Sequence, residues 1–125
     1  MKVVADTSIL IDFLRAKNPE KSIFYRLNQD NYLIISLITA AELFSGKSAQ
    51  IKSGREKLNS LFEGVEIRIP DMEDAFRAGE IRYLHQLTIA DAFVASLALK
   101  LNIKLATLDQ KAFKRIKNLK LYQIN

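Results

Sequence analysis

Four acidic side chains stand where they could act together. Asp6 directly follows the first strand-like segment, Asp109 follows a later one by two residues, Asp91 begins an apolar helical segment, and Glu42 lies within the apolar run 37–44. Carboxylates that lie close together repel one another and raise each other's pKa, and a divalent cation removes this repulsion. All-oxygen ligands favour Mg²⁺ or Mn²⁺, and one His with no Cys disfavours zinc. Such an ion can activate a water and stabilise charge on a phosphodiester, so the pattern is compatible with metal-assisted hydrolysis of a phosphodiester.

The elements that position these acids alternate between strand and helix, which predicts an α/β fold with a parallel sheet and covering helices. Strands are expected at 2–5, 32–35, 65–69, 103–107 and 119–122. Helices are expected at 9–14, from Pro19 onward with Ile23, Phe24 and Leu27 on one face, and at 37–46, 48–62, 72–84, 89–101 and 110–116. Ligands bind beyond the carboxyl ends of parallel strands, where helix N-termini also point, and Asp6, Asp91 and Asp109 are all expected there.

Further detail is expected within four of these helices. Ser8 should cap the first helix and Asp71 the helix 72–84. The helix 48–62 reads as exposed and amphipathic, while 89–101 is the most apolar helix and should be central and buried. The helix 72–84 has a stripe of Ala75, Phe76, Gly79 and Tyr83.

Each acid also has a purely structural interpretation. Asp6 could form a local turn with the two residues after it, and Asp91 could complete a capping box with Thr88. Asp109 could cap the helix 110–116. Glu42 could form a buried ion pair, because an unpaired carboxylate among Leu, Ile and Phe side chains is expensive. The case for a shared site therefore rests on the four acids together.

Other polar residues have less specific assignments. Thr7, Ser8 and Thr107 could contact a metal-bound water or a phosphate, or serve as backbone caps. The single histidine, His85, reads as a surface or interface residue and is given no catalytic role. Four further acids are expected to be exposed on helices: Asp12, Asp71, Glu73 and Asp74.

Length and charge bound the class of protein. A chain of 125 residues fits one domain, 1–125, and 49% hydrophobic residues suffice for a core. Its apolar stretches are too short to cross a bilayer, and no secretory signal begins it, so a cytoplasmic location is expected. The net charge is +5, and residues 100–125 carry seven Lys or Arg side chains but only one acid. This basic segment suits a polyanion partner, or it is a solvated face.

Four segments, taken in order, resemble the PIN-domain family, specifically the VapC-type toxins of toxin–antitoxin pairs. They are residues 4–11, 35–43, 87–96 and 105–109, the last followed by Phe113. The similarity covers nearly the whole chain. It implies a three-layer α/β/α sandwich with a central, mainly parallel sheet, a Mg²⁺ or Mn²⁺ site, and endonucleolytic cleavage of RNA by metal-activated water.

The resemblance also implies roles and partners. Asp6 and Asp91 match the family's most dependable metal-binding acids, Glu42 its buried glutamate, and Asp109 a less uniform fourth position. A homodimer through helices of the first half is implied, as is a cognate antitoxin, a small DNA-binding protein whose tail enters the groove. Two departures concern turns: residues 84–87 form a short connection without glycine, and Asn102 stands where glycine often ends a helix. They bear on RNA preference.

Two other functions compete with a ribonuclease. A catalytically inactive RNA- or partner-binding domain could use the basic segment 100–120. A phosphotransfer enzyme could use Asp6 as its nucleophile, as in haloacid-dehalogenase-like phosphatases. Those enzymes have a second aspartate two residues later, and here that position is Ser8.

Overall fold

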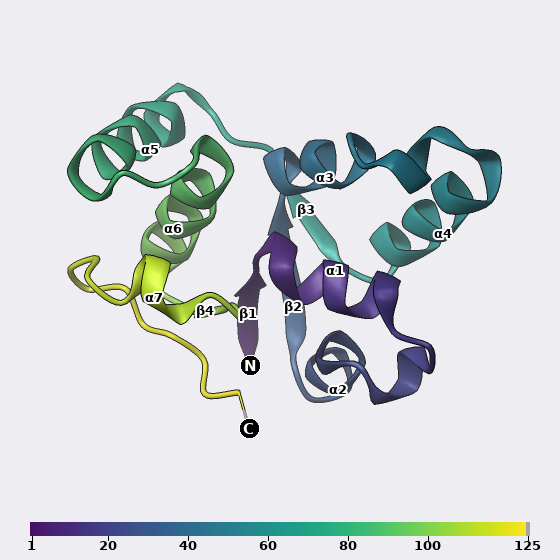
Figure 1. Ribbon diagram of the computed structural model, residues 1–125. Helices are drawn as coiled ribbons and strands as arrows, with labels where there is room; N and C mark the ends of the chain where they lie inside the picture. The colour runs from purple at the N-terminus through teal and green to yellow at the C-terminus, as the bar shows by residue number, and fades with distance from the viewer. Residues whose placement is uncertain (125) are drawn as a thin grey trace.

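A four-stranded parallel sheet forms the centre of the computed structural model, which describes residues 1–124 (Figure 1). The strands are β1 (Lys2–Ala5), β2 (Tyr32–Ser36), β3 (Glu66–Arg68) and β4 (Lys104–Ala106), in the order β3-β2-β1-β4. All three neighbouring pairs are parallel. The chain therefore leaves every strand at the same edge of the sheet, which is where the candidate acids were expected.

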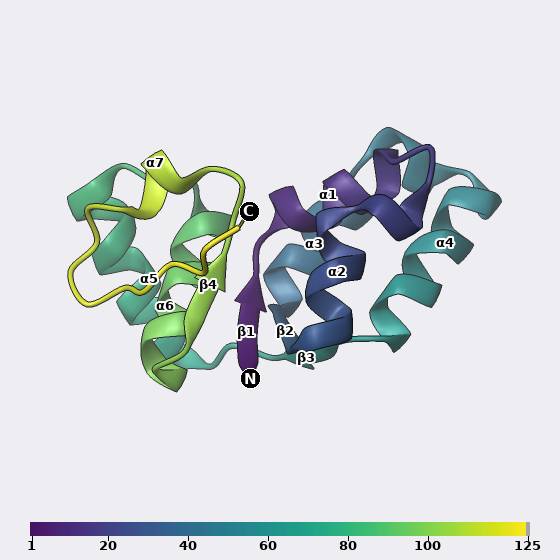
Figure 2. The ribbon, with the colours of Figure 1, turned by 90° about the horizontal axis from the view of Figure 1, so that it is seen from below.

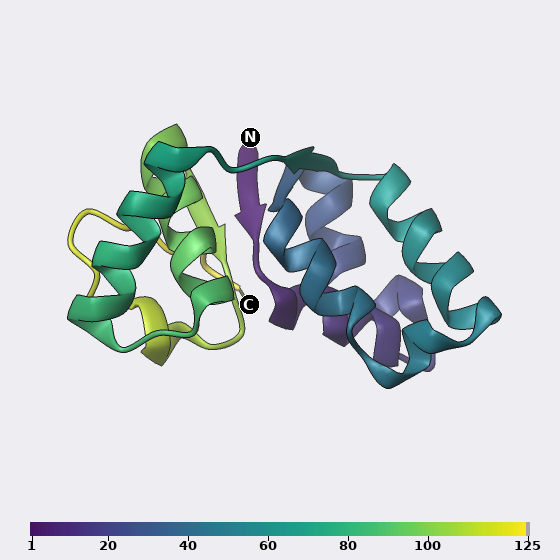
Figure 3. The ribbon, with the colours of Figure 1, turned by 90° about the horizontal axis from the view of Figure 1, so that it is seen from above.

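Helices cover both faces of this sheet, and the predicted three-layer α/β/α sandwich is confirmed (Figure 3). One side carries α1 (Thr7–Arg15), α2 (Ile23–Asp30), α3 (Leu37–Phe44) and α4 (Lys52–Glu63), together with 3₁₀ turns at Pro19–Lys21 and Lys47–Gln50. The other carries α5 (Met72–His85), α6 (Ile89–Leu101) and α7 (Gln110–Phe113).

Each layer of helices closes over its own hydrophobic core. Because side chains alternate along a strand, Val3 and Ala5 of β1 join the cluster with Ile9 and Phe24, whereas Val4 faces the cluster with Val94. Six residues of α6 are buried, so the prediction that 89–101 is the central buried helix is confirmed.

Two helix starts differ from the sequence prediction. Asp6, rather than Ser8, is the N-cap of the first helix, which begins at Thr7. Pro19 starts a separate 3₁₀ turn, and α2 begins only at Ile23, where the Ser22 hydroxyl accepts a hydrogen bond from the Tyr25 N–H at 3.2 Å. Local capping chemistry decides both starts, because these hydroxyl and carboxylate groups satisfy N–H groups that have no partner within the helix.

The segment expected as one exposed helix at 48–62 is instead a 3₁₀ turn followed by α4. Leu58 and Leu61 of α4 are buried against the sheet, so only part of the helix is exposed. Gly54 allows the turn and the helix to pack, because a Cβ there would lie 1.9 Å from the Ser48 carbonyl oxygen. This turn also ends α3 at Phe44, two residues before the expected boundary.

The C-terminal segment is less regular than predicted. The helix expected at 110–116 spans only Gln110–Phe113, and the strand expected at 119–122 is reduced to one parallel bridge between Leu105 and Leu121 (Figure 2). The Leu105 N–H donates to the Lys120 carbonyl at 2.9 Å, and the Tyr122 N–H donates to the Leu105 carbonyl at 2.8 Å.

Both turns that depart from the family pattern use left-handed residues other than glycine. Asn102 ends α6 with φ of 54°, and Gln86 ends α5 with φ of 56°. Asparagine tolerates this conformation better than most side chains, which explains how α6 stops without glycine.

No single helix within residues 1–124 is long and apolar enough to span a bilayer; only α5 and α6 taken together pass that test, and they bend by 116° where they meet.

Candidate active site

The carboxyl edge of the sheet gathers the four predicted acids into one electrostatic neighbourhood. Burial is the largest cause that raises the pKa of Asp91, and the negative charges of Asp6, Glu42 and Asp109 raise it further. Only a hydrogen bond with Thr88 acts in the opposite direction. Acids from the end of β1, from α3, from α6 and from the loop after β4 are therefore close enough for the other three to influence Asp91.

Asp6 is the most enclosed of the four, with 3% of its surface exposed. Its Oδ1 accepts hydrogen bonds from the Ser8 N–H at 3.0 Å, the Ser8 hydroxyl at 2.5 Å and the Ile9 N–H at 3.4 Å. Its Oδ2 accepts one from the Thr107 hydroxyl at 2.5 Å. Burial raises the pKa of Asp6, although these hydrogen bonds lower it. Asp6 thus has a structural duty, capping α1, that also fixes its carboxylate in place.

The two hydroxyls on Asp6 also hold the loop after β4. The Ser8 hydroxyl accepts a hydrogen bond from the Leu108 N–H at 2.9 Å, and the Thr107 hydroxyl accepts one from the Asp109 N–H at 3.0 Å. Each hydroxyl donates a hydrogen bond to Asp6 and accepts one from this loop. Asp6 and Asp109 are therefore connected through a hydrogen-bond network. Sequence reasoning named these hydroxyls as neighbours but did not find this arrangement.

Glu42 is exposed, and the expectation that it would be buried is wrong. The helical period of α3 turns Thr39, Ala40 and Leu43 toward the core and leaves Glu42 outside. Its Oε1 accepts a hydrogen bond from the Thr7 hydroxyl. This contact, rather than a buried ion pair with Lys or Arg, accounts for its position.

Asp91 and Asp109 lie at the starts of α6 and α7. In the described chain neither carboxylate accepts a capping hydrogen bond from a backbone N–H. Thr88 is the N-cap of α6, and its hydroxyl oxygen accepts from the Asp91 N–H at 3.2 Å. Asp109 is the N-cap of α7, yet its carboxylate makes no capping hydrogen bond. Asp91 is half-buried and Asp109 is exposed, so both carboxylates remain available to a ligand.

The remaining acids and the histidine lie apart from these four. Asp71 caps α5 in a capping box with Asp74, as predicted for Asp71. Asp74, however, is not an exposed acid: it is buried, and the Lys100 ammonium lies 3.2 Å from its Oδ1. Burial alone raises the pKa of Asp74, but hydrogen bonds from Asp71 and Lys100 outweigh it and the net pKa is lowered. His85 is half-buried at the last position of α5.

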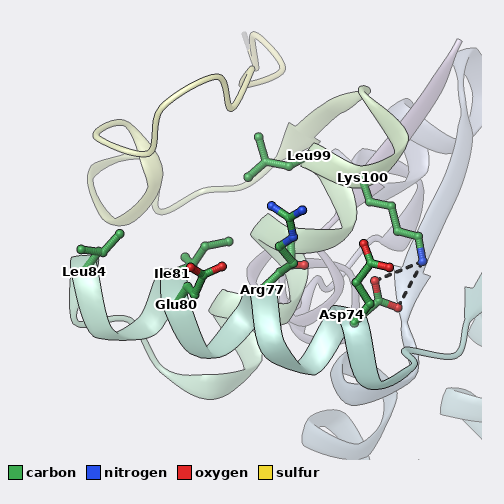
Figure 4. Close-up of a pocket in the computed structure, with 9 residues that line it drawn as sticks. Asp74, Arg77, Glu80, Ile81, Leu84, Leu99 and Lys100 are labelled. Carbon is green, nitrogen blue, oxygen red and sulfur yellow. Dashed lines mark hydrogen bonds and ion pairs between the residues drawn. The ribbon is translucent and has the colours of Figure 1, made fainter.

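One sizeable cavity in the described chain lies away from this acidic cluster. It lies between α5 and α6, has a volume of about 390 Å³ and includes the Asp74–Lys100 pair (Figure 4). None of the four candidate acids lines it. The evidence for the candidate site is therefore the clustering of negative charge and the hydrogen bonds around Asp6, and not the presence of this cavity.

The donor set fits a hard divalent cation. Within residues 1–124 no three carboxylate or imidazole groups are already closed around a metal position. Over the same residues, none of the four acids forms an ion pair with Lys or Arg, so their negative charge is uncompensated. Oxygen ligands and unbalanced negative charge are the features that suit Mg²⁺ or Mn²⁺.

Comparisons with known proteins agree with this architecture. The sequence model of the PIN domain matches residues 3–119. VapBC2 from Rickettsia felis, solved bound to a promoter DNA fragment, includes a chain that is 27% identical, with 100% of both chains covered and a TM-score of 0.79. VapBC-1 from nontypeable Haemophilus influenzae includes one that is 25% identical, with 98% of both chains covered and a TM-score of 0.77.

A more distant match shares the fold. VapC20 from Mycobacterium tuberculosis, described as a toxin that cleaves the sarcin–ricin loop, is 14% identical, covers 94% of this chain and 98% of its own, and gives a TM-score of 0.71. A search of curated proteins finds no significant match.

Proposed function

Because this chain belongs to the PIN domain family, we propose that it is a metal-dependent endoribonuclease, the toxin of a VapBC-type toxin–antitoxin pair. The observation that supports this most strongly is the charge coupling at the sheet edge, where three other carboxylates raise the pKa of Asp91. A protein without a cationic ligand has little reason to keep such a cluster, since it destabilises the fold.

The proposed cation is Mg²⁺ or Mn²⁺, held by Asp6 and Asp91, with Glu42 and Asp109 completing the ligand set directly or through water. When bound, the ion would supply a water of lowered pKa and positive charge beside the scissile phosphate. Glu42 and Asp109 are exposed, so in this proposal they lie on the side of the site from which RNA would enter.

Hydrogen bonds within the chain hold the carboxylates of Asp6 and Glu42 in position. Oδ1 of Asp6 already accepts three hydrogen bonds, whereas Oδ2 accepts only the one from Thr107. We therefore infer that Oδ2 keeps a lone pair for the ligand. Thr7 donates to Oε1 of Glu42, which leaves Oε2 free to orient a water and accept its proton.

The proposed substrate is RNA, bound in part by the basic C-terminal segment. Lys111, Lys114, Arg115 and Lys117 are all exposed and follow Asp109 directly in the chain. Cationic side chains beside a nuclease site hold the phosphate backbone without reading sequence.

A cognate antitoxin, a homodimer and a cytoplasmic location complete the proposal. The Rickettsia and Haemophilus structures are described as VapBC, and the former is bound to promoter DNA. By analogy, an antitoxin partner would cover the four acids of this chain and inhibit it.

The test is cleavage of a structured RNA by the purified chain. We expect cleavage to require Mg²⁺ or Mn²⁺ and to stop with EDTA, and we expect Asp6→Asn or Asp91→Asn to lower the rate by about 100-fold or more. Asp30→Asn is the matched control, since Asp30 ends α2 at the opposite edge of the sheet and is exposed. Equal cleavage by the Asp91→Asn and original proteins would refute the proposal. Salt-sensitive RNA binding without turnover would instead favour an inactive RNA-binding domain.

A further inference from the structure

A second cavity lies where α5 ends and α6 begins, and is here called the junction cavity. It has a volume of about 420 Å³ and is lined by Gly79, Arg82, Tyr83, Gln86, Leu87 and Ile89. Figure 3 shows this connection at the same end of the molecule as the start of α1 and the loop after β4. Asp91, whose pKa the other three acids raise, lies in the first turn of α6. The junction cavity therefore lies at the same edge as the candidate active site.

The junction cavity presents an exposed aromatic ring beside aliphatic side chains. Tyr83 is 86% exposed and Ile89 is 48% exposed, next to the buried Leu87. Gly79 and Tyr83 are four positions apart, on the side of α5 that the sequence predicted as a stripe. That side faces away from the core, which α5 contacts through Ala78. Such a surface suits a planar ligand that stacks on the ring.

Two polar side chains at the junction cavity are hydrogen-bond donors without a partner. Within residues 1–124, no hydrogen bond or ion pair engages the Arg82 guanidinium or the Gln86 side-chain amide. No acid is among the described residues that line the cavity. A ligand here would meet one positive charge and several N–H donors, which favours a ligand with negative charge and acceptor atoms.

Gly79 indicates that the ligand contacts the backbone of α5. It lies in the middle of a fourteen-residue helix, where glycine is less stable than alanine. Its φ is not positive, and a Cβ placed there would meet nothing within 4 Å. The packing of the chain therefore gives no reason for glycine, whereas a ligand in the junction cavity would approach the bare backbone.

Gln86 is held in a backbone conformation that glycine or asparagine adopts more readily. Its φ is 56° and its ψ is 37°, and its N–H donates to the Arg82 carbonyl at 2.8 Å, which closes α5. Residues kept in such conformations cluster at ligand sites, where the role of the side chain offsets the backbone cost. The side-chain amide is the group that Gln86 brings to the cavity and glycine would not.

We propose that the junction cavity binds one unpaired purine base of the RNA substrate, close to the position of cleavage. The base stacks on Tyr83 against the backbone of Gly79, and Arg82 and Gln86 donate hydrogen bonds to its edge. Both purines carry the acceptor N7 on that edge, and guanine adds O6. Unpaired RNA bases are recognised in this way, by stacking on an aromatic ring and hydrogen bonding at an edge. This inference rests on the proposed function, since it assumes an RNA substrate.

Binding of oligo(A) to the full chain in EDTA tests the junction cavity without cleavage. We expect Tyr83→Ala to weaken binding by about 10-fold and Tyr83→Phe to bind like the original, because stacking needs the ring and not the hydroxyl. Leu84→Ala is the matched control: Leu84 is 71% exposed beside Tyr83 but lines the other cavity (Figure 4). Equal affinities of Tyr83→Ala and the original chain, or no binding of oligo(A) at all, would overturn the proposal.

Fluorescence tests where the base lies, because the chain contains no tryptophan. Tyr83→Trp places a single tryptophan at the junction cavity, and oligo(A) should quench it more strongly than oligo(U). Tyr25→Trp is the control, since Tyr25 is 37% exposed on α2, and its emission should hardly change. Equal quenching of the two variants would contradict the stacking, and equal quenching by the two RNAs would contradict the purine assignment.

Two further variants separate a ligand role from a structural one. Gly79→Leu should melt no lower than the original, because leucine favours the helix, yet bind oligo(A) about 10-fold more weakly because its side chain fills the cavity. Gln86→Gly should also melt no lower but lose the preference for oligo(A) over oligo(U). Unchanged binding by Gly79→Leu would contradict the proposal.

The same measurements distinguish this inference from the proposed nuclease. Binding that depends on Tyr83, without any cleavage in Mg²⁺ or Mn²⁺, would refute the nuclease and keep the base site. Cleavage by a chain whose RNA binding is insensitive to Tyr83 would refute the base site and keep the nuclease.

Discussion

The Thr107 hydroxyl donates a 2.5 Å hydrogen bond to Oδ2 of Asp6, joining two residues 101 positions apart in the chain. The pairing of Ala5 with Ala106 sets this contact, because the next residue of each strand is one of the two partners. The same hydroxyl accepts from the Asp109 N–H, so one buried threonine connects two of the four acids.

Removing this hydroxyl should destabilise the protein. Thr107→Val keeps the side-chain shape but leaves the buried carboxylate and the Asp109 N–H each without one partner. We expect a loss of about 1–3 kcal/mol in the free energy of unfolding, measured with urea.

Thr39 provides the matched control for that measurement. It is equally buried, but its hydroxyl has no hydrogen-bond partner in the described chain. Thr39→Val should therefore be neutral or stabilising. A larger loss for Thr39→Val than for Thr107→Val would contradict this account of the Asp6 hydrogen bonds.

Neutralising Asp91 should stabilise the fold while abolishing activity. Burial and the neighbouring carboxylates raise the Asp91 pKa above its ordinary 3.8, so the native state holds this proton more tightly than the unfolded chain does. The contribution of Asp91 to the free energy of unfolding therefore falls as the pH rises above 3.8. It reaches its lowest value once the pH exceeds the pKa of Asp91 in the native state. Asp91→Asn should melt at a higher temperature than the original chain at pH 7, and the difference should shrink toward pH 3.8.

A divalent cation should make the original chain more stable than Asp91→Asn, the reverse of the order expected without the cation. Mg²⁺ or Mn²⁺ that binds only the native state should stabilise the original chain, by about 2.7 kcal/mol at a concentration 100 times Kd. Asp91→Asn should gain much less, and Asp30→Asn should gain as much as the original. Equal stabilisation of all three proteins would show that the cation binds elsewhere.

Lys100 should stabilise the packing of α5 on α6. Its ammonium lies 3.2 Å from Oδ1 and 3.4 Å from Oδ2 of Asp74. Lys100→Met should lower the urea midpoint of unfolding because the buried carboxylate loses a charged hydrogen bond. Lys104→Met, an exposed change on β4, should cost little, and RNA cleavage should be unaffected by either. An unchanged urea midpoint for Lys100→Met would contradict the stabilising role.

The basic segment should set the salt dependence of RNA binding. Replacing Lys111, Lys114 and Lys117 together by Gln should weaken binding and reduce the slope of log affinity against log salt. For single strands the slope falls by about 0.7 for each RNA phosphate that the protein no longer neutralises. Binding measured at several salt concentrations gives this slope directly. A slope that stays the same would place the RNA on another surface.

The position of the acids followed from the sequence because parallel strands share one carboxyl edge. Asp6 and Asp109 come after strands, and Asp91 begins a helix that returns to the same edge. Their mutual electrostatic influence is a direct consequence of that topology.

Other features depended on which side of a helix meets the core, and the sequence did not reveal this. Glu42 has apolar neighbours in the chain, yet the inward side of α3 is Thr39, Ala40 and Leu43. Likewise α5 has apolar residues on more than one side, and packing on α6 leaves Phe76 outside. The hydrogen bond from Thr107 to Asp6 depends on strand register, which only the folded sheet specifies.

A crystal of this protein soaked in Mn²⁺ tests the shared acidic site most directly. We predict an anomalous peak at the carboxyl edge of the sheet, with Asp6 and Asp91 both coordinating the ion. A map with no peak at that edge, or with Mn²⁺ bound only elsewhere, would contradict the shared metal site.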